Sequence, residues 1–454
     1  MAGVIQPQNN NVHDDDAVTD VSTEIVSEHD RAGKGSLTMA WWAVCSAVFF
    51  IVVGIAMARA YGTMNAIIGL LVTVVAYSII SAILTRYAIN TGLSVGLFSR
   101  VLFGAKGAAL ATLIFFATAI YYAVFEGAVI AVALNHMYPG ISYTVAALIV
   151  VLYSVPLVFG SVQNWLDKFN GVLLPFYILG LLGAVALATS KYGYSSDWLS
   201  MGAENATPWG WWNVCVYYMG VWVVTMFAFD YARFGKKEDV RYHTLINFGA
   251  PFYMVAFVLS GLAGIYLVSI IPHGEELSEV TIAFSLIELM GIFGLIFVWI
   301  TQTRINTANY FVATTNMQAF FKDTLHLNWS KMVWAIVVGV VVFLLMLVDV
   351  FAYLLQALAY QGIFVVAWVA IALTHILHPR RVQIFGEVPQ IRSAKLPAFD
   401  SSGLIAWFGA AIVGVILMNI GGVWTNWYAT ITFFVAAILY ALLMPKDKQK
   451  LVDA

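Results

Sequence analysis

Long apolar stretches recur along almost the whole chain, and they constrain the fold more than any other feature. A helix needs about 20 mostly apolar residues to cross a bilayer. Twelve stretches of this kind, bounded by charged residues, glycine or proline, lie near 37–60, 63–85, 107–136, 141–160, 163–189, 209–229, 244–271, 292–321, 331–348, 350–377, 403–421 and 424–444. A shorter stretch at 279–291 predicts an external helix before the eighth span. We therefore expect an all-α polytopic membrane protein with twelve transmembrane helices.

Composition supports a membrane location over a soluble fold. Hydrophobic residues make up 61% of the 454 residues and charged residues only 10%, against about 25% charged in soluble domains. We expect three regions: a disordered acidic cytoplasmic tail over 1–36, with no signal peptide, a transmembrane domain over 37–444, and a cytoplasmic tail over 445–454. Cys45 and Cys215 are the only cysteines. They exclude a disulfide framework or a Cys-rich metal site.

The distribution of Lys and Arg predicts the orientation. With a cytoplasmic N-terminus, nineteen of these residues fall in cytoplasmic segments and only Arg59 and Lys191 fall outside, while Arg304 lies within a span. Cytoplasmic loops carry such an excess of positive charge. We therefore predict an integral protein of the plasma (cytoplasmic) membrane with both termini in the cytoplasm. The net charge of -2 gives no reason to expect a nucleic-acid partner.

Two similar pentapeptides begin the first and the sixth span. Residues 41–45 read WWAVC and residues 211–215 read WWNVC. The first span starts from the predicted cytoplasmic side and the sixth from the opposite side, as expected for an inverted repeat of five plus five helices followed by two more. The alternative is an aromatic belt, because both Trp pairs lie where a helix enters the membrane.

Span eight loses its apolar pattern over four turns. Its polar residues Thr303, Asn306, Thr307, Tyr310 and Thr314 fall within about 100° of arc, and Arg304 flanks them. This stripe lines an aqueous cavity or bonds to another helix. Asn309 lies on the same stretch of helix.

Further candidates lie in spans three, six and ten. In span three, Thr118, Tyr122 and Glu126 share a face, where an aromatic ring beside a carboxylate suits a flat ring with N–H groups. The alternative is a structural pair of Glu126 with Arg304. Trp222 and Thr225 follow a glycine in span six, and their alternative role is ordinary packing. Gln361 is a lone polar residue in span ten.

No motif of a soluble enzyme or nucleotide site occurs, such as H-E-x-x-H, G-x-x-x-x-G-K-[ST] or G-x-S-x-G. We therefore predict a protein that is not an enzyme and holds no cofactor or metal. Any active transport would have to be driven by an ion gradient, with H⁺ or Na⁺ as the coupling ion.

Two loop motifs carry a family resemblance. Residues 91–107 (TGLSVGLFSRVLFGAKG) closely resemble the segment between spans two and three of the nucleobase:cation symporter-1 family, the cytosine and purine permeases. Residues 230–236 (DYARFGK) resemble the D-[FY]-x-R-[FY] motif that follows span six in that family. The resemblance extends over about 37–444, and it implies the leucine-transporter type of inverted repeat with two extra C-terminal helices.

The resemblance also implies where a solute would bind, between spans one, three, six, eight and ten. Tyr122 stands where span three often has a stacking Trp, and Ser46 and Phe49 lie near the expected break of span one. Trp222 to Thr225 lie near the break of span six. The sodium-binding hydroxyls of the family fall on Thr303 and Arg304, so a guanidinium replaces one ligand. The solute-contacting Asn falls on Ile305 unless the register shifts to Asn306.

We therefore predict a secondary active transporter that imports a nucleobase or related N-heterocycle, such as cytosine or a purine, by alternating access. The expected partners are a small solute and the lipid bilayer. The alternative is a permease for a carboxylate-bearing heteroaromatic such as urocanate, with Arg304 holding the carboxylate or replacing the cation, and therefore sodium-independent. The candidate substrate-binding residues are Ser46, Phe49, Tyr122, Glu126, Trp222, Thr225, Arg304, Asn306, Asn309 and Gln361, and the candidates for a cation or its surrogate are Thr303 and Arg304. A channel, a membrane enzyme and a sensor fit the pattern less well.

Overall fold

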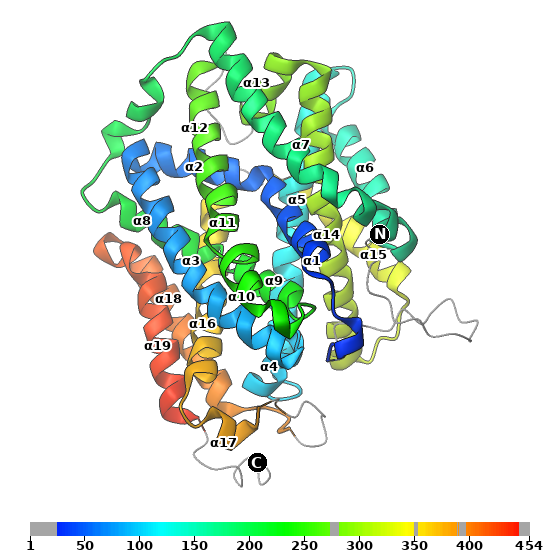
Figure 1. The fold of residues 1–454 in the computed structure, drawn as a ribbon, viewed down its shortest axis with the longest axis vertical. Coiled ribbons are helices and arrows are strands. Elements are labelled where there is room, and N and C mark those ends of the chain that lie inside the picture. The colour runs from blue at the N-terminus through cyan, green and yellow to red at the C-terminus, as the bar shows by residue number, and fades with distance from the viewer. Residues whose placement is uncertain (1–24, 273–280, 349–352, 388, 390–395, 445–454) are drawn as a thin grey trace.

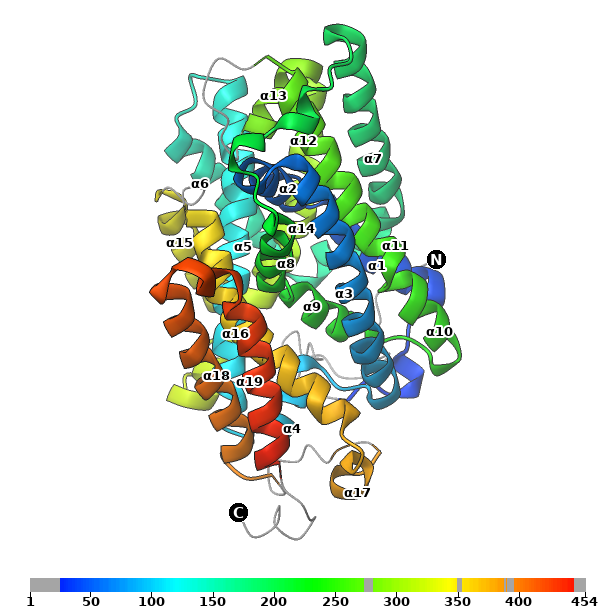
Figure 2. The ribbon, with the colours of Figure 1, turned by 90° about the vertical axis from the view of Figure 1, so that its left-hand side faces the viewer.

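Helices form almost all the regular structure in the computed structural model, which describes residues 25–272, 281–348, 353–387, 389 and 396–444. The first half contains α1 (Lys34–Trp42), η2 (Ala43–Ser46), α2 (Val48–Tyr61), α3 (Thr63–Thr91), α4 (Val95–Phe103), α5 (Ala108–Met137), α6 (Tyr143–Ser154) and α7 (Gly160–Tyr192). The second half contains α8 (Gly210–Gly220), α9 (Val223–Ala232), α10 (Val240–Tyr242), η7 (His243–Asn247), α11 (Ala250–Tyr253), η8 (Met254–Leu259), α12 (Ser260–Ile270), α13 (Thr281–Met290), α14 (Ile292–Leu325), α15 (Lys331–Met346) and α16 (Leu354–Leu377). After α17 (Arg381–Phe385) the chain ends in α18 (Ser401–Ile420) and α19 (Tyr428–Leu443), which lie side by side next to α16 (Figure 2). Of the predicted tails, 1–36 and 445–454, residues 1–24 and 445–454 lie outside the described residues, whereas 25–36 are described and 34–36 already belong to α1.

These helices fall on the predicted spans. Within the described residues, six helices are long and apolar enough to cross a membrane, and two bent pairs bring the number to eight. The shorter apolar helices that begin at Tyr143, Lys331 and Tyr428, together with α14, fall on the other four spans. The predicted fold class, an all-α polytopic membrane protein, is confirmed.

The two halves of the fold carry matching irregular features. In the first span, α1 and η2 meet α2 at a bend of 44°, and in the sixth, α8 meets α9 at a bend of 48°. The short helix α4 follows the second span and α13 follows the seventh, and the two lie at opposite ends of the molecule (Figure 1). Opposite placement of corresponding elements is what an inverted repeat produces. We refer to the two ends as the α4 end and the α13 end.

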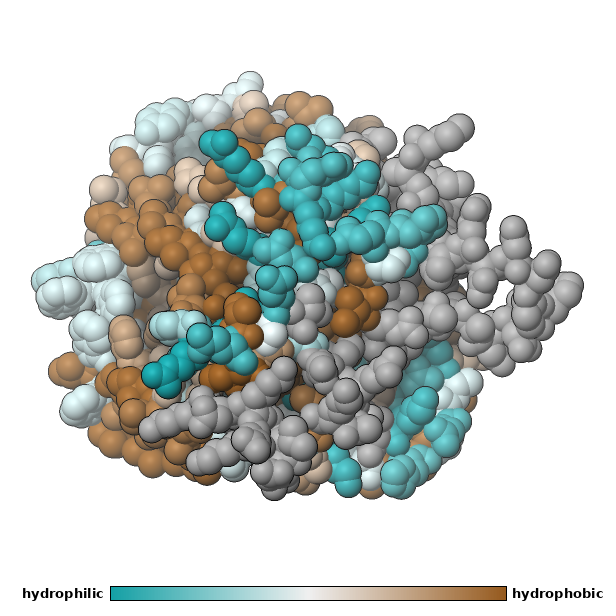
Figure 3. Space-filling view, turned by 60° about the horizontal axis from the view of Figure 1, so that its bottom comes forward, coloured by the Kyte–Doolittle hydropathy of each residue, from teal (hydrophilic) through white to brown (hydrophobic). Residues whose placement is uncertain are grey.

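The surface of the helical body is apolar, as lipid requires. Leu152, Leu179 and Val75 are among the large side chains that point outward. Seen from the α4 end, hydrophilic side chains gather on the end face while hydrophobic ones dominate the flank (Figure 3). The described structure is thus polar at its end and apolar along its sides, in keeping with a membrane-embedded protein.

The two loop motifs that carry the family resemblance meet at the α4 end. The Asp230 carboxylate accepts a hydrogen bond of 2.7 Å from the backbone N–H of Val95, the first residue of α4. Phe98 of α4 stacks on Phe229 with ring centroids 5.6 Å apart. An acidic group at a helix N-terminus stabilises it, because it satisfies a free N–H and opposes the helix dipole. Asp230 therefore holds α4 against the end of span six.

A close approach of two backbones explains a glycine beside the bend of span six. A Cβ on Gly362 of α16 would lie 2.6 Å from Cα of Gly220, the last residue of α8. Because Cβ atoms do not approach other atoms so closely, position 362 requires glycine for this crossing. The packing fixes α8 against α16 where α8 ends.

Candidate functional site

The break in span one leaves a backbone donor that another helix satisfies. Ala47 has an extended conformation (φ -63°, ψ 122°) between η2 and α2. The N–H of Val48, which opens α2, therefore has no carbonyl within its own helix. It donates instead to Oε1 of Gln302 in α14, at 2.9 Å. Gln302 thus ties span eight to the break of span one.

The same side chain also reaches span three. Nε2 of Gln302 donates to Oε2 of Glu126 in α5. Both side chains are buried, with exposed fractions of 0% and 1%, and no ion pair of Glu126 occurs in the part of the chain that the structure describes. The Gln302 amide therefore bridges an N–H on one side and a carboxyl group on the other. The alternative structural pair of Glu126 with Arg304 is not formed.

Three aromatic rings form a wall beside this bridge. The ring of Phe49 in α2 lies edge-on to Tyr122, with centroids 5.1 Å apart, and to Phe125, with centroids 5.5 Å apart. The Tyr122 hydroxyl lies near the Gln361 amide of α16, but no hydrogen bond of good geometry joins the two groups. Spans one, three and ten thus contribute to one aromatic and polar cluster, next to the Gln302–Glu126 contact.

Helix α14 presents a row of amides to α5, which we call the amide face: Gln302, Asn306 and Asn309. The two helices run antiparallel, since Glu126 contacts Gln302 while Phe116, earlier in α5, contacts Phe320, later in α14. Tyr122 lies one turn before Glu126 along α5, and Asn306 lies one turn after Gln302 along α14. Because the two helices are antiparallel, Tyr122 and Asn306 therefore lie at the same level. Nδ2 of Asn306 lies 3.6 Å from the Cβ position of Gly127.

Several polar groups near this cluster are buried without a hydrogen-bond partner among the described residues. They are Nδ2 and Oδ1 of Asn306, Nδ2 of Asn309, Nε2 of Gln361 and the Tyr122 hydroxyl. Burying such a group unpaired costs about 1–3 kcal/mol. Both ends of the Asn306 amide are affected, so this residue has the greatest capacity to bond to another molecule.

Other predicted site residues point elsewhere. The Trp222 ring packs on Phe433 of α19, with centroids 5.8 Å apart, and the Thr225 hydroxyl donates to the carbonyl of Trp222 at 2.7 Å. The Ser46 hydroxyl donates likewise to the carbonyl of Ala43 at 2.8 Å. These two hydroxyls stabilise the breaks locally.

The proposed cation ligands also lie off the amide face. The Thr303 hydroxyl bonds to the Tyr153 hydroxyl of α6 at 2.7 Å, so it faces span four. Arg304 is two positions from both Gln302 and Asn306, which sets it about 200° around the helix from each. Its half-buried side chain therefore lies on a different face of α14 from the amides.

An apolar recess lies one turn from Tyr122 toward the α4 end. It is small, with a free volume of about 10 Å³, roughly enough for one water molecule. Its lining comes from α5, α9, α16 and α18 and includes Thr118, Phe115, Val223 and Trp368. Thr118 is one turn from Tyr122, so the recess continues the face of α5 that carries Tyr122 and Glu126.

Gln302 is not among the site residues predicted from the sequence. The signal was present, because Gln302, Asn306 and Asn309 are amides at spacings of four and three residues, which places them on one helical face. The hydroxyl-rich stripe that begins at Thr303 concealed it.

Several solved structures share the fold of this chain. The chain superposes on Mhp1, described as a nucleobase-cation-symport-1 family transporter in a closed conformation with bromovinylhydantoin bound, with a TM-score of 0.72 and 16% identity over 95% of this chain and 98% of that one. An inward-facing conformation of Mhp1 gives a TM-score of 0.74 with 15% identity over 93% and 92%. This chain has the fold of Mhp1. The predicted family resemblance is confirmed at the level of the fold.

More distant structures share the architecture. A Na⁺-coupled sialic acid symporter in a substrate-bound outward-open state matches with a TM-score of 0.58 and 16% identity, over 90% of this chain and 88% of that one. No protein-family model and no curated protein sequence matches the chain. These neighbours are transporters of the leucine-transporter fold, and the chain shares that fold.

Proposed function

We propose that the chain imports a flat, neutral N-heterocycle of the nucleobase class by alternating access, with the solute held between α2, α5, α14 and α16. The observation that carries the proposal is the set of unpaired buried groups on Asn306, Asn309 and Gln361, next to the rings of Phe49 and Tyr122. A planar ring with several donors and acceptors would pair these groups and stack on an aromatic face.

The contacts of Gln302 suggest which edge of the solute is recognised. Its amide accepts a bond from Val48 N–H and donates one to Glu126. A ring with adjacent C=O and N–H groups offers the same acceptor and donor in the same order. Pyrimidines and purines that carry such a lactam edge could therefore compete with the Gln302 side chain for these two partners. Mhp1, whose structure contains a bromovinylhydantoin, is the neighbour that motivates this chemistry.

The alternative solute, a heteroaromatic carboxylate such as urocanate, depends on Arg304. Its position about 200° from Gln302 and Asn306 gives no direct route to the ring that Tyr122 would stack on. We therefore favour the neutral solute, with the carboxylate as the second arm of the test. The coupling ion is H⁺ or Na⁺, and Glu126 is the residue through which a proton would act. A plasma-membrane location with cytoplasmic termini is part of this proposal.

The test is uptake in cells that lack their own permeases. Labelled cytosine, uracil, adenine, allantoin and urocanate are supplied in turn, with sodium removed and then with the proton gradient collapsed. We expect saturable uptake of at least one neutral heterocycle and none of urocanate. Uptake of urocanate alone would favour the second solute class, and no uptake of any compound, together with no thermal stabilisation of the purified protein by them, would refute the proposal.

A matched pair of variants in α14 then tests the site. Asn306→Ala removes the unpaired amide and should raise KM about tenfold or more, because it deletes at least one hydrogen bond to the solute. Asn316→Ala is the control, since the Asn316 amide bonds to the carbonyl of Val312 in its own helix at 2.8 Å and lies outside the cluster. Equal KM values for the two variants would place the site elsewhere.

A further inference from the structure

The segment before α1 forms a strap across the ends of two other spans. We define the strap as residues 25–33, which include the short 3-10 helix η1 (Glu28–Asp30). The N–H of Val26 donates to the carbonyl of Gly92 just after α3, at 3.1 Å, and the N–H of Ala32 donates to the carbonyl of Phe234 just after α9, at 2.7 Å. Although this segment belongs to the acidic region 1–36, its described part is packed against the helices.

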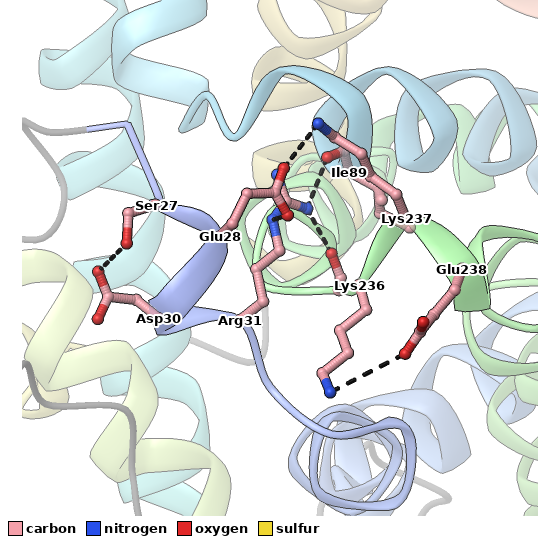
Figure 4. Close-up of polar contacts among 9 residues, drawn as sticks. Ser27, Glu28, Asp30, Arg31, Ile89, Lys236, Lys237 and Glu238 are labelled. Carbon is pink, nitrogen blue, oxygen red and sulfur yellow. Dashed lines mark hydrogen bonds and ion pairs between the residues drawn. The ribbon is translucent and has the colours of Figure 1, made fainter.

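Arg31 anchors the strap (Figure 4). Its side chain is 3% exposed. Nη1 donates to the carbonyl of Ile89 in the last turn of α3 at 2.7 Å and to the carbonyl of Gly235 at 2.5 Å. The last carbonyls of a helix lack intrahelical donors and carry the negative end of its dipole, so a guanidinium is well suited to them. One side chain therefore joins the ends of spans two and six.

Glu28 adds an outer layer of ion pairs. Its carboxylate lies 3.1 Å from Nε of Arg31 and 2.6 Å from Nζ of Lys237. The bond from Lys237, with the charge of Arg31 adding to it, lowers the pKa of Glu28, while burial lowers the pKa of Arg31 and Glu28 opposes that shift. Glu28 is exposed, and exposed pairs contribute little. The buried Arg31 contacts are the anchor, and the Glu28 pairs are secondary.

Helix α1 itself attaches to the segment that follows α9. Trp41 packs on Phe252 and Phe248, with ring centroids 4.6 Å and 5.2 Å apart, and the indole N–H of Trp42 donates to the carbonyl of Asn247 at 3.1 Å. Thr38 bonds to the Tyr242 hydroxyl at 3.1 Å. The middle and the C-terminal end of α1 thus contact residues that follow α9.

We propose that the strap clamps α1 to the ends of α3 and α9, so that these elements move as one body and α1 does not swing separately about the break at Ala47. The break is a natural hinge because its backbone is extended there. Arg31 would then be the residue that keeps the inner half of span one attached during the transport cycle. This inference concerns motion of the chain and does not depend on which solute is carried.

Two native cysteines report on such a motion. Cys45 lies in η2 directly after α1 and is fully buried, and Cys215 lies in α8 and is also buried. Swinging of α1 would expose Cys45 and leave Cys215 covered. The full-length protein in detergent is treated with a thiol reagent, and the modification rates of the two cysteines are measured by mass spectrometry.

Arg31→Ala should raise the modification rate of Cys45 by roughly tenfold or more, because a buried anchor is lost, with Cys215 unchanged. Arg31→Lys, which cannot hold both carbonyls with the same geometry, should raise the rate less. Glu28→Gln is the matched control and should change it by less than about twofold. Unchanged reactivity of Cys45 in Arg31→Ala, or an equal rise at both cysteines, would overturn the proposal. Faster hydrogen exchange in α1, with α19 unchanged, is the second measurement expected.

Discussion

The two broken spans solve the same backbone problem in different ways. At the break of span six, Val221 N–H donates to the carbonyl of Tyr218 and Trp222 N–H to that of Met219, at 3.0 and 3.1 Å. These bonds are local, so the turn is complete within its own chain segment. At the break of span one, the N–H of Val48 depends on Gln302 of another helix.

This difference suggests a division of labour between the two breaks. Span six is also held by the crossing of Gly220 and Gly362, so its break acts as a fixed bend. Span one is joined through Gln302 to Glu126, next to the proposed solute. A solute or proton that alters the Gln302–Glu126 contact would therefore act directly on span one and not on span six.

The largest expected effect comes from removing the Gln302 amide, which pairs with the N–H of Val48 at the break of span one. Gln302→Leu keeps the size of the side chain but removes the amide, so Val48 N–H and the Glu126 carboxyl group lose their hydrogen-bond partner. Leaving each buried group unpaired costs about 1–3 kcal/mol. We expect the uptake rate at low solute concentration to fall about 100-fold, or the melting temperature of the purified protein to fall clearly. Gln318→Leu is the control, at a half-buried position of the same helix where the amide donates to the carbonyl of Trp329 at 3.1 Å. Normal uptake and stability in Gln302→Leu would mean that the break of span one needs no external partner.

The second prediction concerns the fixed bend. Gly362→Ala places a methyl group 2.6 Å from Cα of Gly220, which forces the two helices apart. Overpacking of this kind costs about 1–3 kcal/mol, so the protein should unfold at a lower temperature whichever solute is present. Gly183→Ala in α7 is the control, because nothing lies within 4 Å of its Cβ position. A Gly362→Ala protein that melts normally but fails to transport would show that the bend of span six moves too.

Span positions and helix breaks were predictable, whereas the facing of individual helices was not. Long apolar runs and the paired WWxVC segments report on the solvent around a helix and on repetition. They say little about how each helix is rotated about its own axis. Thr303 looked equivalent to Asn306 on a polar stripe, yet the Thr303 side chain faces Tyr153. The facing of α14 is decided by packing against α5 and α6. Sequence pattern alone does not contain that information.

The positions of charged residues also predicted the site and the N-terminal segment incompletely. Arg304 attracted attention because a cation is costly within a bilayer, but the group that spans the break is the neutral Gln302. Arg31 lies in a segment rich in acidic residues, where composition predicts disorder. Its burial depends on carbonyls of Ile89 and Gly235, which lie 58 and 204 residues away along the chain. Such contacts become visible only once the helices are assembled.

The smallest predicted effects concern a local side-chain hydrogen bond that occurs at both breaks. The hydroxyl of Ser46 donates to the carbonyl of Ala43, and that of Thr225 to the carbonyl of Trp222, each three residues earlier. Net hydrogen bonds of this kind contribute about 0.5–1.5 kcal/mol, and the backbone around each break keeps its other bonds. Ser46→Ala and Thr225→Val should therefore each lower stability slightly and change KM by less than about threefold.

Equal small effects of these two variants would show that the local hydroxyls are interchangeable, and would leave the external bond from Gln302 as the feature that distinguishes span one. A large rise in KM for Ser46→Ala alone would mean that this hydroxyl bonds to the solute when the solute is bound. A large rise for Thr225→Val alone would instead bring span six into the solute site. Uptake kinetics for both variants, measured at matched surface expression, decide among these outcomes, because a purely structural role lowers the amount of folded protein without changing KM.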